Sequence, residues 1–145
     1  MIQNKTQKYP SILILLFVLP TLLVACAKQP ETGLASLDQM PNDVKSAPVK
    51  VQQAYQYAVA NPQIMEQIPC YCGCGKMGHT SNYACYASGV DANGKVLFDT
   101  HALGCSICVD ITQDTMRLLK EGKSVTEIKA YVDQTYAKYG QSNMP

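Results

Sequence analysis

Six cysteines and both histidines of the chain lie within residues 70–108. The stretch begins with the cysteines of the hexapeptide PCYCGC, whose first residue is Pro69. The soft donors in it are Cys70, Cys72, Cys74, His79, Cys85, His101, Cys105 and Cys108. Outside it the chain has one further cysteine, Cys26, and no histidine. Thiol and imidazole groups at this density indicate either metal coordination or, for the thiols, disulfide bonding.

The spacing of the cysteines favours metal coordination. Alternate residues of an extended segment point to the same side, so Cys70, Cys72 and Cys74 can aim three sulfurs at one centre. Cys105 and Cys108 form a C-x-x-C pair at a predicted helix start, a spacing that lets two sulfurs share an ion. The helix N-terminus also favours thiolate over thiol. We therefore predict that all eight donors are metal ligands, at one centre or at two.

Copper is the metal we expect first and zinc second. Thiolate-rich sites select Cu(I), zinc or iron–sulfur clusters, and an exposed iron–sulfur cluster is a poor fit to a protein outside the cytosol. Cu(I) accepts two or three thiolates, whereas zinc takes a closed Cys/His tetrahedron. Covalent haem is excluded because it needs C-x-x-C-H, and Val109 follows Cys108.

The first 25 residues are typical of a secretory signal peptide. Lys5 and Lys8 precede a run of fifteen residues without charge. This run is short for a membrane-spanning helix, which needs about 20 apolar residues, and it contains Pro20. The sequence LVAC that ends at Cys26 resembles the bacterial lipobox, which implies cleavage before Cys26 and acyl chains such as palmitate on that residue. We expect a lipid anchor on the extracytoplasmic face of the cell membrane.

Disulfides are the alternative for a protein outside the cytosol, because the domain holds an even number of cysteines. Bridges inside the triplet are disfavoured, since a bridge across one residue strains the dihedral of about 90°. If disulfides form, each cysteine of the triplet would therefore pair outward, with Cys85, Cys105 or Cys108. A disulfide-stapled domain remains an open alternative.

Charge argues against nucleic acid as a partner. Removal of residues 1–25 takes away Lys5 and Lys8, which leaves ten basic and eleven acidic residues and a net charge near −1. The sequence has no basic stripe and no aromatic–basic interleaving.

The mature chain divides into a tether, a domain and a tail. Residues 26–47 are polar and contain Pro30 and Pro41, so we expect the lipidated cysteine to be followed by a flexible tether. Residues 48–140 are the Cys-rich domain and 141–145 a tail. A domain of about a hundred residues buries only a small core, which a metal or disulfides would support.

Apolar spacing predicts helices at both ends of the domain. One helix follows Pro48, and another begins at Pro62 with Asn61 as its cap. Residues 75–104 are irregular, with a turn at 91–94 and a short strand at 96–98. A helix from Cys105 ends at Gly122, and a capping box at 124–127 opens the last helix. The predicted fold is mainly α: a small helical domain with an irregular Cys-rich loop and short β-hairpin, and a C-terminal antiparallel helical hairpin.

The motifs resemble those of the bacterial PCYCGC motif-containing lipoproteins. The likeness rests on PCYCGCG, His79, NYACY at 82–86, His101-Ala102 and CSIC at 105–108, and it covers roughly residues 48–140. It implies a lipoprotein with this motif and implies no established reaction. A weaker likeness links the C-x-x-C and the C-terminal hairpin to the thiol-redox subunit of cytochrome c maturation, which implies a reducing dithiol at Cys105 and Cys108.

These features predict a lipid-anchored protein that binds a soft metal as a carrier, buffer or sensor. A metal-donor or metal-acceptor protein is the partner expected of such a function. The alternatives are a thiol–disulfide redox or assembly factor that uses Cys105 and Cys108, and a disulfide-stapled structural or binding lipoprotein. No Ser-His-Asp set and no paired carboxylates accompany the cluster, so we predict no catalytic residues.

Overall fold

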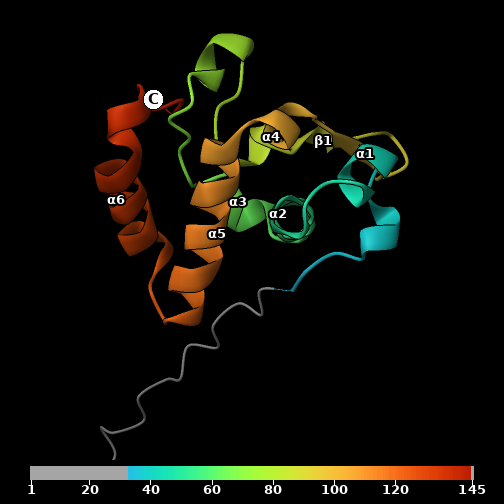
Figure 1. Ribbon diagram of the computed structural model, residues 1–145, viewed down its shortest axis with the longest axis horizontal. Coiled ribbons are helices and arrows are strands. Elements are labelled where there is room, and N and C mark those ends of the chain that lie inside the picture. The colour runs from blue at the N-terminus through green and yellow to red at the C-terminus, as the bar shows by residue number, and fades with distance from the viewer. Residues whose placement is uncertain (1–32, 145) are drawn as a thin grey trace, which may run out of the picture. The chain divides into compact units, whose positions relative to one another are not determined.

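A computed structural model describes residues 33–144 of the chain. Cys26, the predicted signal peptide and the first part of the expected tether therefore lie outside the described residues. Within them the chain forms six α-helices, four short 3₁₀ helices and one sheet of two strands, so the prediction of a mainly α domain is confirmed (Figure 1). None of the helices in this range has both the length and the apolar character needed to cross a bilayer.

Helix α2 (Val49–Ala60) follows Pro48, as predicted, and lies in the middle of the domain. It buries four side chains, Ala54, Tyr55, Tyr57 and Ala58. Helix α3 (Pro62–Met65) starts at Pro62, also as predicted. Asn61 does not cap it with its side chain. Its amide instead donates to the carbonyls of Tyr57 and Gly33, at 2.8 and 2.9 Å, so it closes α2 and holds the preceding segment.

Residues 33–47 differ from the flexible tether that their composition indicates. They form the 3₁₀ helix η1 (Leu37–Gln39) and the short helix α1 (Asn42–Lys45). Met40 and Val44 are buried in the core. Two apolar anchors four residues apart are enough to dock this segment on α2, where the Gln56 amide donates to the carbonyl of Ala35 at 2.8 Å.

The predicted turn at 91–94 connects two antiparallel strands, β1 (Ala87–Val90) and β2 (Val96–Phe98). The carboxylate of Asp91 accepts hydrogen bonds from the backbone N–H groups of Asn93 and Lys95, at 2.8 and 2.9 Å. Gly94 adopts a φ of 78°, which most side chains disfavour. The hairpin brings the chain back from the cysteine-rich loop, and its β2 strand leads towards His101.

Helices α5 (Ser106–Lys120) and α6 (Val125–Tyr136) form the predicted helical hairpin. Gly122 takes a φ of 85° at the turn, and Ser124 and Glu127 form the predicted capping box. Helix α5 packs against α6 on one side and α2 on the other (Figure 1). The short helix α4 (His101–Gly104), which the sequence did not predict, lies directly before α5. The 3₁₀ helix η4 (Ala137–Tyr139) extends α6 to Gly140.

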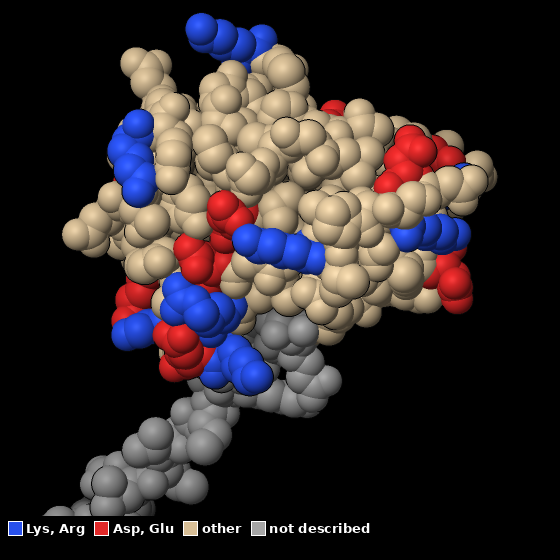
Figure 2. Space-filling view, viewed as in Figure 1, with Lys and Arg blue, Asp and Glu red and all other residues tan. Residues whose placement is uncertain are grey.

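Charged side chains of both signs are mixed on the face seen in Figure 2. Their densest gathering in that view contains blue and red side chains side by side. Arg117, for example, pairs with Asp114 at 3.0 Å and with Glu121 at 2.9 Å along α5 and its end. This face therefore presents no broad field of one sign.

Candidate metal centre

Three parts of the fold bring the cysteines together. The PCYCGC segment follows α3, Cys85 ends the 3₁₀ helix η3 (Tyr83–Cys85), and Cys105 and Cys108 come from the start of α5. Cys70, Cys74, Cys85 and Cys108 are at most 1% exposed, while Cys72 and Cys105 are partly exposed. None of the six cysteines in the described part of the chain is in a disulfide.

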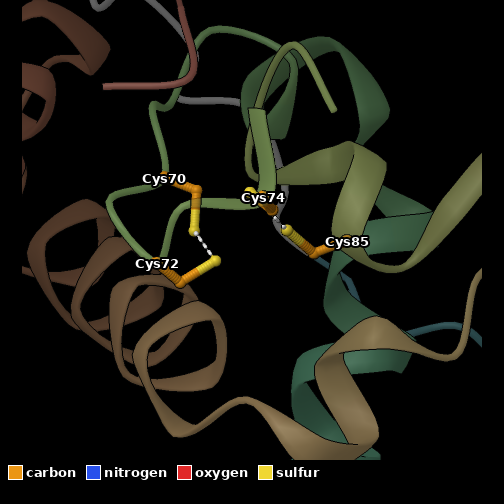
Figure 3. A group of neighbouring side chains, drawn as sticks. All are labelled: Cys70, Cys72, Cys74 and Cys85. Carbon is orange, nitrogen blue, oxygen red and sulfur yellow. Dashed lines mark hydrogen bonds between the residues drawn. The ribbon is translucent and has the colours of Figure 1, made fainter. Parts of the chain in front are cut away.

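The PCYCGC segment is bent at its glycine and is not a simple extended strand. Gly73 adopts a φ of 85°, and Cys74 begins the 3₁₀ helix η2 (Cys74–Met77). The bend turns Cys74 towards Cys85, whose sulfur lies 3.7 Å from the Cys74 sulfur (Figure 3). The three motif sulfurs converge as predicted, but through a left-handed glycine and not through strand alternation.

Four sulfurs make up the first donor group: Cys70, Cys72, Cys74 and Cys85. All of these atoms lie within 4.8 Å of one another, and the Cys70 and Cys72 sulfurs are 3.4 Å apart (Figure 3). A tetrahedral ion with metal–sulfur bonds of about 2.3 Å separates its sulfurs by about 3.8 Å. The group therefore has the dimensions of a single four-coordinate site.

A second donor group combines three cysteines with a histidine: Cys72, His101, Cys105 and Cys108. These donor atoms also lie within 4.8 Å of one another. The Cys72 sulfur is 3.4 Å from Nε2 of His101 and 3.6 Å from the Cys108 sulfur. Helix α4 presents His101, whose backbone N–H donates to the Asp99 carboxylate at 2.7 Å. Cys105 stands at the N-cap of α5, so the C-x-x-C pair opens that helix as predicted.

The two groups are continuous. Cys72 belongs to both, and the Cys70 sulfur lies 3.4 Å from the Cys108 sulfur. Together the groups contain seven of the eight predicted ligands. They consist of thiols and one imidazole, the donors that soft and borderline metals prefer.

The comparisons with known proteins place the chain in a family. A family model described as "Protein of unknown function with PCYCGC motif" matches residues 23–144. The chain belongs to the PCYCGC family. No curated protein and no solved structure matches it.

The motif that defines the PCYCGC family supplies three of the seven donors in this chain. The other four, Cys85, His101, Cys105 and Cys108, also fall inside the matched range. The hexapeptide therefore supplies only part of the donor set and is not a complete site.

Hydrogen bonds among the thiols in this PCYCGC-family site favour one thiolate over the others. The bonds from Cys108 and then from Cys85 hold the pKa of Cys70 well below its usual range. The same bond to Cys70 raises the pKa of Cys108. Burial, followed by the charge on Cys70, raises the pKa of Cys72. Within this cluster the hydrogen bonds therefore favour the charged form at Cys70 over the charged form at Cys72 and Cys108.

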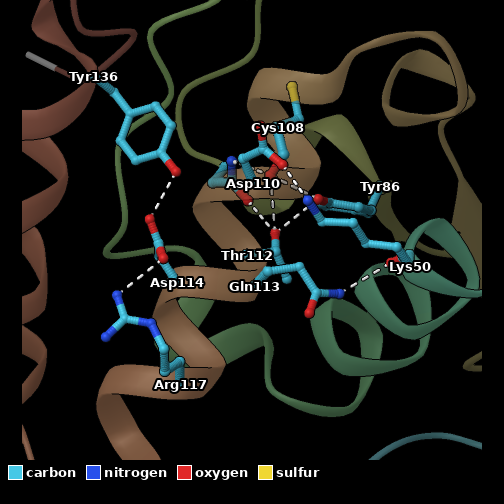
Figure 4. Close-up of polar contacts among 10 residues, drawn as sticks. Lys50, Tyr86, Cys108, Asp110, Thr112, Gln113, Asp114, Arg117 and Tyr136 are labelled. Carbon is cyan, nitrogen blue, oxygen red and sulfur yellow. Dashed lines mark hydrogen bonds and ion pairs between the residues drawn. The ribbon is translucent and has the colours of Figure 1, made fainter.

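A buried polar network fixes the backbone of Cys108. The Tyr86 hydroxyl donates to the Cys108 carbonyl at 2.9 Å and lies 2.7 Å from the Thr112 hydroxyl (Figure 4). Thr112 donates in turn to Oδ1 of Asn82 at 2.8 Å. Asn82 and Thr112 are fully buried. Asn82 belongs to the NYACY motif, but no pattern in the sequence predicted that it would contact Thr112.

Asn143, in the predicted tail, holds the PCYCGC segment from the other side. Its side-chain oxygen accepts from the Cys70 N–H at 2.7 Å, and its own N–H donates to the Cys70 carbonyl at 3.0 Å. Its amide nitrogen donates to the Ser81 carbonyl at 3.0 Å and lies 3.5 Å from the Cys74 sulfur. No local pattern predicts this contact, because it joins positions 73 apart.

His79 is the predicted ligand that falls outside both groups. Its ring packs edge-on against that of His101, with centroids 5.2 Å apart, and its Nε2 is 3.6 Å from the Asp99 carboxylate. Nδ1 of this buried ring has no hydrogen-bond partner among the described residues. Asp99 thus lies beside the ring of His79 and accepts from the backbone N–H of His101. Asp110 pairs with Lys50 at the surface. Ligation by His79 stays a prediction.

Proposed function

We propose that the protein is a lipid-anchored, extracytoplasmic lipoprotein that binds soft metal ions through its Cys/His cluster, as a carrier, buffer or sensor. The observation that carries this proposal is the pair of donor groups, each with four soft donor atoms within 4.8 Å of one another. Chain segments as far apart as Cys70 and Cys108 bring their sulfurs to 3.4 Å.

The distances favour coordination over disulfide bonding. Neighbouring sulfurs lie 3.4 to 3.7 Å apart, near the spacing around a tetrahedral ion and well above a covalent S–S bond of about 2.0 Å. Neutral thiols are readily buried, but buried thiolates need a positively charged partner. A metal ion supplies that partner for all of them together.

Cu(I) and Zn(II) are the ions we propose. Thiolate and imidazole donors suit both ions. Four donors per group match a closed zinc tetrahedron, while Cu(I) needs only two or three of the same thiolates. Metal content measured on the native protein decides between them.

The anchor in this proposal is Cys26, at the end of the lipobox-like LVAC. Support comes from the apolar run before it and from the basic residues at the start of the chain. Several acyl chains bind a membrane far more firmly than one chain does. Cys26→Ser should move the protein from the membrane fraction to the soluble fraction without changing its metal content. Retention of the variant in the membrane would refute the anchor.

The central experiment is elemental analysis of protein isolated from its own envelope, combined with a thiol count after chelation and denaturation. We expect copper or zinc, and free thiols at all six cysteines of the domain. Cys72→Ser should reduce the metal content, because Cys72 belongs to both groups. Lys76→Ala, an exposed change in the same loop, is the matched control and should leave it unchanged. Full disulfide bonding with no metal would refute the proposal and favour the stapled lipoprotein.

Thiol–disulfide chemistry is the second candidate, favoured by the direct contact of sulfurs and by the lowered pKa of Cys70. On this alternative, Cys105 and Cys108 would change oxidation state with the ambient potential while bound metal stays absent. Thiol titration across a series of redox buffers measures this. A constant count of free thiols in the metal-loaded protein would exclude it.

A further inference from the structure

We infer that the cluster is a dinuclear centre in which the Cys72 thiolate bridges two metal ions. This inference rests on the proposed metal-binding function and specifies its site. The two donor groups overlap at one residue only, and that residue is Cys72. Seven donors with one of them shared are the number that two four-coordinate ions require.

The dimensions of the cluster allow two ions to share this sulfur. Two ions at about 2.3 Å from one sulfur, with a near-tetrahedral angle between them, lie about 3.8 Å apart. Paired metal ions in proteins are commonly about 3.5 to 4 Å apart. The contacts of Cys72 with Cys70, His101 and Cys108, at 3.4, 3.4 and 3.6 Å, place donors of both groups around its sulfur.

The number of donors favours a second ion. A single ion in the first group takes four thiolates and leaves His101, Cys105 and Cys108 without a metal. Two divalent ions held by six thiolates carry the same net charge as one divalent ion held by four, so the second ion adds no uncompensated charge to the buried cluster.

The two positions differ in their access to solvent. In the first group three of the four donors are buried, and only Cys72 is partly exposed. In the second group three of the four, Cys72, His101 and Cys105, are partly exposed. The ion at the second group is therefore the one that exchanges with chelators or acceptor proteins, and the ion at the first group is the one retained.

The test uses the reduced full-length chain in detergent, with ¹¹³Cd²⁺ as the probe because cadmium prefers thiolates and is visible by NMR. We expect two bound ions and two resonances, each split by the other through the shared sulfur. A chelator should remove the two ions in two kinetic phases. The splitting needs no substitution, so it tests the bridge even where a variant is unstable.

Variants then assign the positions. Cys105→Ser should remove one ion, the one that leaves first, and keep the other resonance. Cys72→Ser should shift or abolish both resonances, and Lys76→Ala is the control that should change neither. A single bound ion, two resonances without splitting, or a Cys72→Ser variant that retains one resonance unmoved would overturn the bridged centre and leave the proposed function intact. Failure to bind any cadmium would overturn both.

Discussion

Replacing Tyr86 with Phe removes one hydroxyl from beside the candidate metal centre and leaves the packing of the ring intact. Tyr86 is fully buried, and its ring packs edge-on against Tyr55 with centroids 4.9 Å apart. The hydroxyl lost makes two contacts, with the Cys108 carbonyl and with Thr112. The perturbation is therefore polar and creates almost no cavity.

The expected cost follows from those two contacts. A typical hydrogen bond contributes about 1 kcal/mol net, and a buried partner left unpaired costs about 1–3 kcal/mol. The Cys108 carbonyl still accepts from the Asn82 amide at 3.3 Å, and Thr112 still donates to Asn82, so neither group is left alone. We expect Tyr86→Phe to lower the free energy of unfolding by about 1.5–2.5 kcal/mol.

Urea unfolding of the reduced, metal-free protein measures this change. Tyr57→Phe is the matched control, because the Tyr57 hydroxyl is buried and has no hydrogen-bond partner among the described residues. Its removal should leave stability unchanged or raise it by about 1 kcal/mol. Both variants lose a tyrosine hydroxyl. A loss of stability in Tyr86→Phe that is absent in Tyr57→Phe would therefore come from the hydrogen bonds of the network. Equal effects of the two changes, or a loss below about 0.5 kcal/mol for Tyr86→Phe, would refute the role given to this network.

Three further predictions concern the shell of the site and the buried core. Asn143→Ala should lower the free energy of unfolding by about 1–3 kcal/mol and weaken metal binding about tenfold, because it leaves the N–H of Cys70 without its acceptor. Competition with a chelator measures the affinity for metal. The exposed Asn93→Ala is the control. Gly73→Ala should destabilise the domain by about 1–2 kcal/mol in urea unfolding, because its φ of 85° is strained for alanine. Burial raises the pKa of Tyr57 to about 12, above its unfolded value of about 10, so the folded state keeps this proton more tightly. The contribution of this raised pKa to stability is complete below about pH 10 and is lost as the pH rises towards 12. In an alkaline unfolding series, the free energy of unfolding should therefore fall less for Tyr57→Phe than for the unaltered protein. An identical fall in the two proteins would contradict the raised pKa of Tyr57.

Local signals in the sequence were sufficient to predict four of the six helices in the described residues, α2, α3, α5 and α6. Pro48, Pro62, Gly122 and the Ser124 capping box each act on the neighbouring backbone, so their effect is readable from a few residues. Residues 33–47 have the polar, proline-containing composition of a tether, yet the part of the chain that the structure describes folds them into short helices, because Met40 and Val44 are buried in the core.

The membership of the cluster was predictable, but its arrangement was not. Soft donors concentrated in one stretch pointed to the site, since thiols and imidazoles have few other uses at that density. The division into two groups, and the position of His79 outside them, depend on the bend at Gly73 and on the short helix α4. Asn82, Thr112 and Asn143 reach the site through tertiary contacts, which no local pattern encodes.

Sulfurs that lie close together in the cluster come from distant positions in the chain. This separation affects how a partner could sense whether the protein holds metal. Cys72 and Cys108 belong to the same donor group and are 36 positions apart, so an ion held between them closes a long loop and limits how far the PCYCGC segment can move from α5. Handing the ion to an acceptor would reverse this and loosen the junction of the PCYCGC segment with α5. A downstream protein could then distinguish the loaded from the empty form by rigidity alone, without contacting the metal.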